Sequence, residues 1–251
     1  MASSVRESFT WPQRRTIATM TTDDQADAHE HHEHHEHHEH DDHAHHEHHE
    51  HRPEPLDYTE AVEGFRAEKD HYFKHADGSP LPAAEREAFD GLPYFPVDPD
   101  LRFDDLTLEP YAGSEPQRFA IPTSDGKLRP AHRAGSFHFE MGGDRRSLAA
   151  YVIDHPAEHV HDDAVPGDEE TLPSVFVPFL DATSGHETYG AGRYLDLEPE
   201  EDGTYSLDFN LAYHPSCVYD IRFSCPLTPA ENRLPIRIEA GERLSEDDAG
   251  H

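Results

Sequence analysis

Apolar and polar residues alternate along much of the chain after residue 105, which is the pattern of strands with one buried face. Residues 136–141 place Phe137, Phe139 and Met141 on one side, and residues 205–213 repeat an apolar residue at every second position. Glycine-containing turn pairs separate such segments, at 125–126, 142–143 and 202–203. The spacing predicts about nine or ten strands between residues 106 and 238, as in an antiparallel sandwich or barrel.

The pattern before residue 92 is helical instead. Residues 57–76 predict a helix that begins at Asp57 or Thr59 and carries one mostly apolar stripe. The stripe consists of Val62, Phe65, Lys69, Tyr72 and Phe73. A second short helix is expected from Ser79–Pro80 through Phe89, ended by Gly91.

These patterns divide the chain into three parts. Residues 1–52 are expected to be a disordered arm, residues 53–243 one mainly-β domain with a short N-terminal helical segment, and residues 244–251 a polar tail. Residues 1–19 carry Arg6, Arg14 and Arg15, so they differ in charge from the acidic body. We interpret them as upstream sequence, with Met20 as the native start.

One segment of the arm has an extreme composition. Residues 29–51 contain 14 of the chain's 24 histidines, eight carboxylates and a single alanine, with no side chain large enough to enter a core. Imidazole is a common ligand of zinc, nickel, cobalt and copper, and many overlapping spacings predict loose, exchangeable binding. The expected metal ligands are His31, His32, His34, His35, His37, His38, His45, His46, His48 and His49. The alternative is a solvated polar linker.

The charge of the chain indicates which partners and which salt concentration to expect. The formal net charge is −33, and three lysines stand beside 17 arginines. An acidic surface poor in lysine is typical of proteins that stay hydrated at molar salt, so we predict a halophilic protein. Nucleic acid is not expected as a partner, because binding phosphates requires a basic patch.

Neither an export signal nor a membrane span is expected from the sequence. No apolar run has the length of a membrane span, and Arg14–Arg15 precedes no apolar export region. The two cysteines fit a reducing compartment. We therefore expect a soluble, cytoplasmic protein that has no membrane partner.

Longer motifs follow in the second half of the chain. They read FVPFLDATSGHETYGAGRYLDL at 176–197, DFNLAY at 208–213, CPLTPAENRLP at 225–235 and, upstream, FDGLPYFPVDP at 89–99. With these motifs the chain resembles the domain of unknown function 1684 family (DUF 1684) over roughly residues 58–243. The family favours Asn where this chain has His214, and the resemblance implies no reaction. The histidine-rich segment lies outside it.

Polar residues that interrupt apolar or glycine-rich segments are the candidates for a pocket. We expect Asp181, Glu187, Arg193 and Asp208 in catalytic roles, with Asn210, Glu231 and Asn232 binding a ligand. Arg193 would hold a carboxylate or phosphate, and two carboxylates of unequal pKa could act as acid and base. The structural alternatives are an Asx-turn at Asp181 and an ion pair between Glu187 and Arg193.

His214, Cys217 and Cys225 form a weaker pattern. They suit a zinc or copper site, a disulfide or redox pair, or two buried structural thiols. If residues 218–223 run as one strand, the cysteines lie about 26 Å apart, and only a turn near Tyr219–Asp220 would bring them together.

Three functions remain open from the sequence. The first is a metal-gathering arm with a β domain that binds a small ligand. The second is a small-molecule enzyme with hydrolase-like acid and base chemistry, and the third is a purely structural or interaction module.

Overall fold

The computed structural model describes residues 6–7, 57–154 and 172–245, so the histidine-rich segment lies outside the described residues. Among them, the helix is α1 (Tyr58–His75), and short 3₁₀ helices are η2 (Pro99–Leu101), η3 (Phe209–Leu211), η4 (Ser216–Val218) and η5 (Ala230–Asn232). The strands are β1 (Arg6–Glu7), β2 (Arg102–Leu106), β3 (Glu109–Pro110), β4 (Arg118–Pro122), β5 (Leu128–Met141), β6 (Asp144–Ile153), β7 (Val175–Phe179), β8 (Arg193–Leu197), β9 (Tyr205–Asp208) and β10 (Phe223–Ser224).

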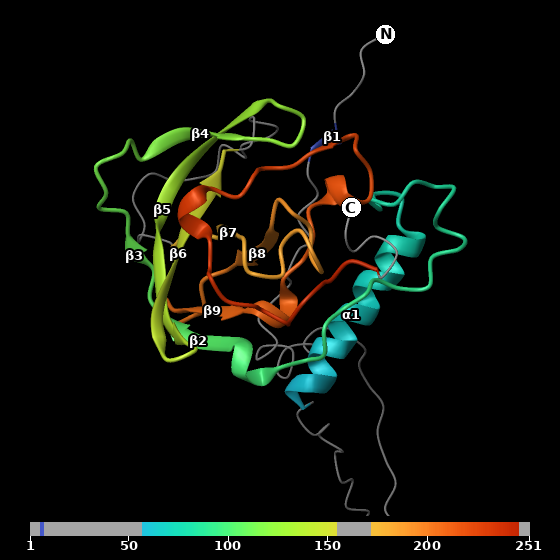
Figure 1. Ribbon diagram of the computed structural model, residues 1–251, viewed down its shortest axis with the longest axis horizontal. Helices are drawn as coiled ribbons and strands as arrows, with labels where there is room; N and C mark the ends of the chain where they lie inside the picture. The colour runs from blue at the N-terminus through green and yellow to red at the C-terminus, as the bar shows by residue number, and fades with distance from the viewer. Residues whose placement is uncertain (1–5, 8–56, 155–171, 246–251) are drawn as a thin grey trace, which may run out of the picture.

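The largest sheet is antiparallel and has the strand order β3-β5-β6-β7-β8, with β4 also paired to β5 (Figure 1). Its longest hairpin joins β5 to β6 through Gly142 and Gly143, whose φ values of 65° and 79° are the left-handed pair that a tight hairpin requires. A second antiparallel sheet pairs β2 with β9. The prediction of a mainly-β antiparallel fold is therefore confirmed, and both sheets are open.

The main core lies between these two sheets. Side chains of β5 and β6 that point to one face, such as Phe137 and Leu148, pack with Tyr205 and Leu207 of β9. The ring centroids of Phe137 and Tyr205 are 5.2 Å apart. Alternate residues face the other side of the large sheet, where Tyr151 belongs to a smaller aromatic cluster with Phe176, Tyr194 and Tyr213. Strand β7 is buried along its whole length because both faces are covered.

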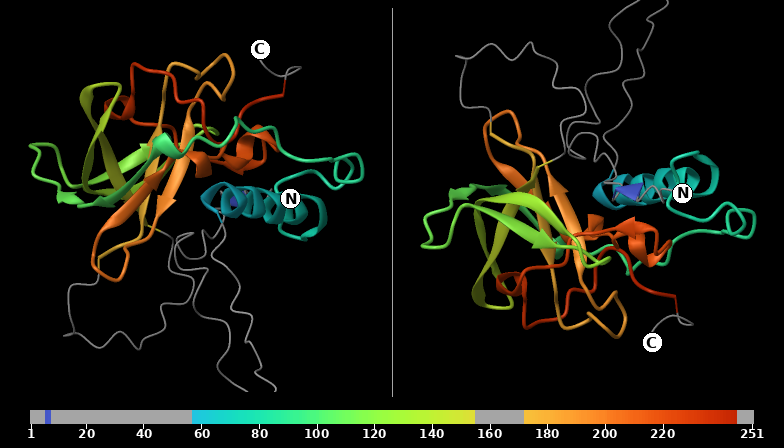
Figure 2. Two further views of the ribbon diagram at one scale, coloured as in Figure 1. Left: turned by 90° about the horizontal axis from the view of Figure 1, so that it is seen from below. Right: turned by 90° about the horizontal axis from the view of Figure 1, so that it is seen from above.

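Helix α1 lies at the end of the molecule away from β3 and β4, next to the C-terminal part of the chain (Figures 1 and 2). Its bounds confirm the predicted helix of residues 57–76. Val62 and Phe73 are buried, and so is Lys69. After the last turn, the Ser79 hydroxyl donates to the Phe73 carbonyl at 2.5 Å, which satisfies one of the carbonyls left open at the end of the helix.

The predicted second helix, from Ser79 to Phe89, was wrong, because residues 83–88 form turns. The Arg86 guanidinium donates to the carbonyls of Ala76 and Leu81, at 2.8 and 3.1 Å. Because one side chain fixes these carbonyls, the segment folds around Arg86 instead of extending a helical ladder.

The predicted strand at residues 205–213 is shorter than its alternation suggests. Strand β9 ends at Asp208, whose carboxylate accepts the Asn210 backbone N–H at 2.9 Å and starts the 3₁₀ helix η3. Competition of an aspartate side chain with the strand ladder explains the early end.

The N-terminal segment contributes one short element. Strand β1 pairs in parallel with β10, with Arg6 opposite Phe223 and Glu7 opposite Ser224. No helix in the part of the chain that the structure describes combines the length and the apolar character needed to cross a membrane.

Candidate functional site

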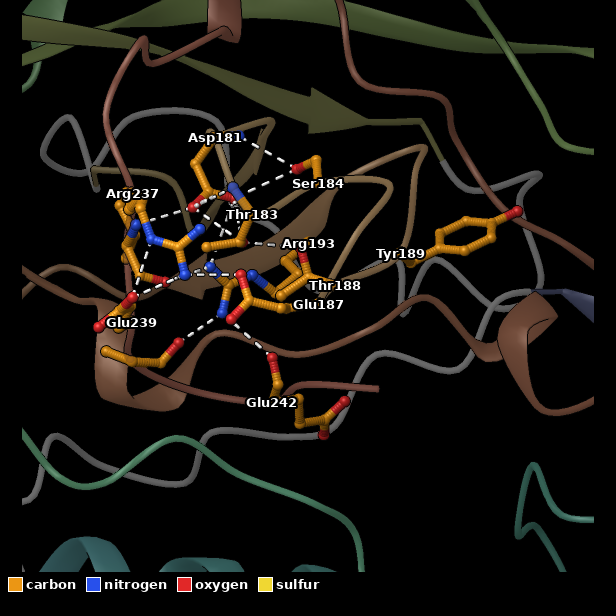
Figure 3. A network of polar contacts seen from close by, with 12 residues as sticks. Asp181, Thr183, Ser184, Glu187, Thr188, Tyr189, Arg193, Arg237, Glu239 and Glu242 are labelled. Carbon is orange, nitrogen blue, oxygen red and sulfur yellow. Dashed lines mark hydrogen bonds and ion pairs between the residues drawn. The ribbon is translucent and has the colours of Figure 1, made fainter. Parts of the chain in front are cut away.

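Arg193 is the centre of a buried polar network (Figure 3). Its guanidinium donates to the carbonyls of Ile238, at 2.9 Å, Glu242, at 3.1 Å, and Ala240, and lies 3.5 Å from an Asp181 oxygen. Burial lowers the Arg193 pKa to about 10, against the opposing effect of Asp181, so the group stays charged at neutral pH. Arg193 therefore fixes β8 to the segment that ends the domain.

The Asp181 carboxylate accepts hydrogen bonds from several neighbouring groups. It accepts the Thr183 hydroxyl at 2.9 Å and the Ile238 backbone N–H at 2.8 Å, and the Ser184 hydroxyl at 3.2 Å. The Thr183 backbone N–H also donates to it at 3.3 Å, which closes an Asx-turn. These contacts support the structural alternative for Asp181.

The other two residues expected in catalysis contact different partners. Glu187 is partly exposed, and its carboxylate lies 2.6 Å from Arg237 rather than pairing with Arg193. Asp208 accepts the Tyr58 hydroxyl at 2.9 Å, and burial raises its pKa. Of the four residues expected in catalysis, Asp181 and Arg193 therefore lie together, whereas Glu187 pairs with Arg237 and Asp208 bonds Tyr58.

Asn210 joins the start of α1 to the loop before β2. Its amide oxygen accepts the Asp98 backbone N–H, and its nitrogen donates to the Asp98 carbonyl, both at 2.8 Å. The same nitrogen also donates to the Tyr58 hydroxyl at 2.9 Å. All of these contacts are within the protein, so Asn210 links Tyr58 at the start of α1 to Asp98 in the loop before β2.

A second charged cluster, which the sequence analysis missed, is built on Lys69 and Glu242. Their ion pair measures 2.5 Å. The other Glu242 oxygen accepts the His214 backbone N–H at 2.7 Å and the Tyr219 hydroxyl at 2.9 Å. Burial alone would raise the Glu242 pKa, but Lys69 and His214 outweigh it and hold the pKa below its ordinary value. The available signal was a lysine on an apolar helix stripe in a chain with three lysines.

His214 is buried inside this cluster. Its Nε2 accepts the Tyr189 backbone N–H at 3.2 Å, which places the proton on Nδ1, 3.7 Å from Glu242. Burial lowers its pKa to about 4, so the imidazole is neutral at pH 7. Within the described ranges, no group of three or more His, Cys, Asp or Glu side chains has a metal-holding arrangement.

A separate groove lies on the face of the large sheet away from the main core. This groove has a volume of about 350 Å³ and is lined by Tyr111, Glu115, Arg133, Gly135, Ser136, Ala149 and Glu231. Ser136 and Ala149 are cross-strand partners and form its floor. Gly135 is required there, because a Cβ atom would lie 2.1 Å from the Glu109 carbonyl oxygen.

Asn232 fixes one wall of the groove. Its side chain accepts the Ala149 backbone N–H and donates to the Ala149 carbonyl, at 2.7 and 2.8 Å, and also reaches the Pro178 carbonyl at 2.7 Å. Strand β6 pairs with β7 only at Tyr151 and Phe176. The Asn232 side chain therefore makes the hydrogen bonds to Ala149 that a neighbouring strand would otherwise make. This clamp holds η5, and with it Glu231, over the sheet.

The charged groups of the groove are held by aromatic neighbours. The Tyr151 hydroxyl donates to Glu231 at 2.8 Å. Burial is the main cause that raises the Tyr151 pKa, and this hydrogen bond is the second. On the opposite wall, the Arg133 guanidinium lies 4.1 Å from the Phe119 ring and 5.7 Å from the Tyr111 ring. The groove thus presents a carboxylate and a guanidinium in fixed positions.

The two cysteines meet, although they lie eight positions apart. The 3₁₀ helix η4 and a turn closed by the Phe223 N–H and the Asp220 carbonyl, at 3.0 Å, reverse the chain between them. The Cys217 N–H donates to the Cys225 sulfur at 3.3 Å, and both thiols are free. The turn that the sequence analysis required is therefore present, while His214 points to Tyr189 and Glu242.

Comparisons with known proteins place the sequence among uncharacterised relatives. Residues 87–243 match the family described as "Protein of unknown function (DUF1684)". A solution NMR structure of an uncharacterised protein from Haloarcula marismortui is 37% identical, covers 74% of this chain and 94% of its own, and superposes with a TM-score of 0.51. No curated protein matches the sequence.

Proposed function

The chain belongs to the DUF1684 family of proteins of unknown function, and from this premise we propose that its β domain binds a small polar molecule in the groove beneath Glu231. The observation that carries the proposal is the pairing of a fixed carboxylate with a fixed guanidinium around one cavity. Small-molecule sites combine a concave surface with a few placed polar groups.

The lining residues support a ligand that carries both an acidic group and a hydrogen-bond donor. One nitrogen of the Arg133 guanidinium donates to the Pro116 carbonyl at 2.7 Å. A guanidinium has five N–H donors in all, so its other donors suit a carboxylate or phosphate group on the ligand. Glu231 and Glu115 would accept an amine or hydroxyl, and Tyr111 offers a ring. A small molecule with one acidic group and one donor group fits this arrangement.

The test uses amide resonances of the groove floor. A panel of amino acids, small carboxylates and sugar phosphates is added to the full chain, and shifts of the Ser136 and Ala149 amides are followed by NMR. Binding is expected to weaken at least tenfold in Arg133→Gln and in Glu231→Gln, since each loses a charge-assisted hydrogen bond of about 1.5–3 kcal/mol.

Matched controls remove the same charges outside the groove. Arg118→Gln on β4 and Glu239→Gln near the end of the domain change exposed side chains and should keep wild-type affinity. A panel that leaves both amides unmoved, or a ligand bound equally by groove variants and controls, would refute the proposal.

For the histidine-rich segment, residues 29–51, we propose collection of divalent transition metal ions such as zinc, nickel, cobalt or copper. Its 14 histidines and eight carboxylates support this role. Elemental analysis of the protein purified without a metal column should find several ions per chain. The same chain with these histidines changed to glutamine should lose them, and equal metal in both forms would refute the proposal.

A further inference from the structure

The Cys217 sulfur sits among three hydrogen-bonding groups. They are the Cys225 thiol, whose sulfur accepts the Cys217 backbone N–H at 3.3 Å, and the hydroxyls of Ser124 and Tyr189. Hydrogen bonding to these groups, to Cys225 foremost, favours the thiolate over the thiol and lowers the Cys217 pKa to about 6. A cysteine in such surroundings is ionised at neutral pH and is a nucleophile.

The three groups are themselves held in place. The Ser124 backbone N–H donates to the Cys225 carbonyl at 2.8 Å, and the Cys225 N–H donates to the Ser124 hydroxyl at 3.1 Å. The Tyr189 backbone N–H donates to His214 at 3.2 Å. The neutral, buried imidazole thus positions a residue that contacts the thiolate.

The two sulfurs differ in their access to solvent. Cys217 is partly exposed, whereas Cys225 is 1% exposed. The bond to Cys217 also raises the Cys225 pKa, so Cys225 keeps its proton while Cys217 is ionised. A reagent from solution therefore meets Cys217 first, while the buried Cys225 sulfur lies 3.3 Å from the Cys217 backbone nitrogen.

We propose that Cys217 is a redox-active nucleophile that a hydroperoxide oxidises and that Cys225 resolves as an intramolecular disulfide. The accessible thiolate, the buried second thiol and the contact between them are the parts that such a reaction needs. Of the three uses that the sequence left open for this pair, the geometry favours the redox pair.

The reaction balances in two steps. The Cys217 thiolate attacks the terminal oxygen of the hydroperoxide, the O–O bond breaks, and the leaving alkoxide becomes an alcohol by taking up, through solvent, the proton that the Cys217 thiol released on ionising. The Cys225 sulfur then attacks the Cys217 sulfenic acid, an S–S bond forms, and the S–O bond breaks. The hydroxide released takes the Cys225 proton, so two thiols and one hydroperoxide give a disulfide, an alcohol and water.

The test oxidises the reduced full chain with one equivalent of tert-butyl hydroperoxide. Native alkylation and intact mass should show both thiols protected and two hydrogen atoms lost, without dimers. Cys225→Ser should accumulate a sulfenic acid on Cys217 that dimedone traps, and Cys217→Ser should leave the hydroperoxide unconsumed. Two thiols that stay alkylatable, disulfide-linked dimers only, or equal oxidation of Cys217→Ser would overturn the proposal.

A pH profile separates an activated thiolate from an ordinary exposed thiol. The rate of Cys217 alkylation by iodoacetamide should have its midpoint near pH 6. At pH 6 it should exceed the rate of free cysteine about tenfold, since the larger thiolate fraction outweighs the lower nucleophilicity. Tyr189→Phe should move the midpoint upward, with the fold checked by circular dichroism. A midpoint near 8.5 in the wild type would mean that Cys217 is not activated.

Discussion

Lys69, in the middle of α1, forms a 2.5 Å ion pair with Glu242, near the end of the domain, and the two side chains are only 4% and 1% exposed. The Lys69 ammonium also lies 4.7 Å from the centre of the Tyr213 ring. Two buried charges are tolerated because each neutralises the other and both have further polar or aromatic contacts. The pair therefore attaches the helix to the β domain.

Removing one partner of this pair should be strongly destabilising. Lys69→Met leaves the Glu242 carboxylate buried without its cation, and we expect a loss of about 3–5 kcal/mol in the free energy of unfolding by urea. Lys127→Met, which removes an ammonium that is 58% exposed, is the control and should have little effect. A small loss for Lys69→Met would show that water reaches Glu242.

Acid should destabilise the protein through His214. Its folded pKa of about 4 lies below the unfolded value near 6.5, so between these pH values the unfolded state binds the proton and stability falls as pH falls. The full effect is about 3 kcal/mol. Burial is the largest cause of the low His214 pKa; Glu242 opposes it, and the charges of Arg193 and Lys69 add to it.

His214→Asn, the residue that the family favours there, should flatten this part of the pH profile. The measurement is the difference in unfolding free energy between pH 7 and pH 4.5, in wild type and variant. His186→Asn alters an exposed imidazole and should keep the wild-type slope. An unchanged slope in His214→Asn would assign the acid sensitivity to other groups.

The Tyr58 hydroxyl should stabilise the start of α1 against β9. Tyr58→Phe removes the donor that lies 2.9 and 3.0 Å from the two Asp208 oxygens, so a buried carboxylate loses a partner. We expect a cost of about 1–3 kcal/mol. Tyr111→Phe, whose hydroxyl bonds an exposed carbonyl, is the matched control and should cost less in the same urea titration.

The net charge of −33 predicts a salt requirement. Lowering sodium chloride from molar concentration to tens of millimolar lengthens the Debye length from about 3 Å toward 20 Å or more, so repulsion between acidic side chains increases. The melting temperature of the full chain should fall steadily over this range. A melting temperature independent of salt would contradict the halophilic interpretation.

Local patterns determined which parts of the fold were predictable. Alternation in residues 136–141 identified strand β5, and the apolar stripe identified α1, because both depend on neighbours close in sequence. The same alternation misled at residues 209–213, where the Asp208 side chain starts a 3₁₀ helix. A side-chain hydrogen bond of this kind leaves no mark on hydrophobic periodicity.

The site was less predictable for a related reason. Asp181 and Arg193 stood out as polar residues in apolar segments, and they do meet, but what Arg193 mainly binds is main-chain carbonyls, which no residue type reveals. The groove could not be foreseen, because Arg133 and Glu231 come together only through strand pairing and the Asn232 clamp. Glu231 is among the predicted ligand-binding residues, and that role stays a prediction, whereas nothing in the pattern of strand β5 distinguishes Arg133.

The pairing of Lys69 with Glu242 also sets an order for biosynthesis. A ribosome makes Lys69 long before Glu242, so the growing chain holds α1 with an ammonium on its apolar stripe and no carboxylate to receive it. Docking of α1 cannot be completed until the last part of the domain has left the ribosome. Helix α1 is thus among the last elements to settle, and until then its apolar side chains stay exposed to solvent.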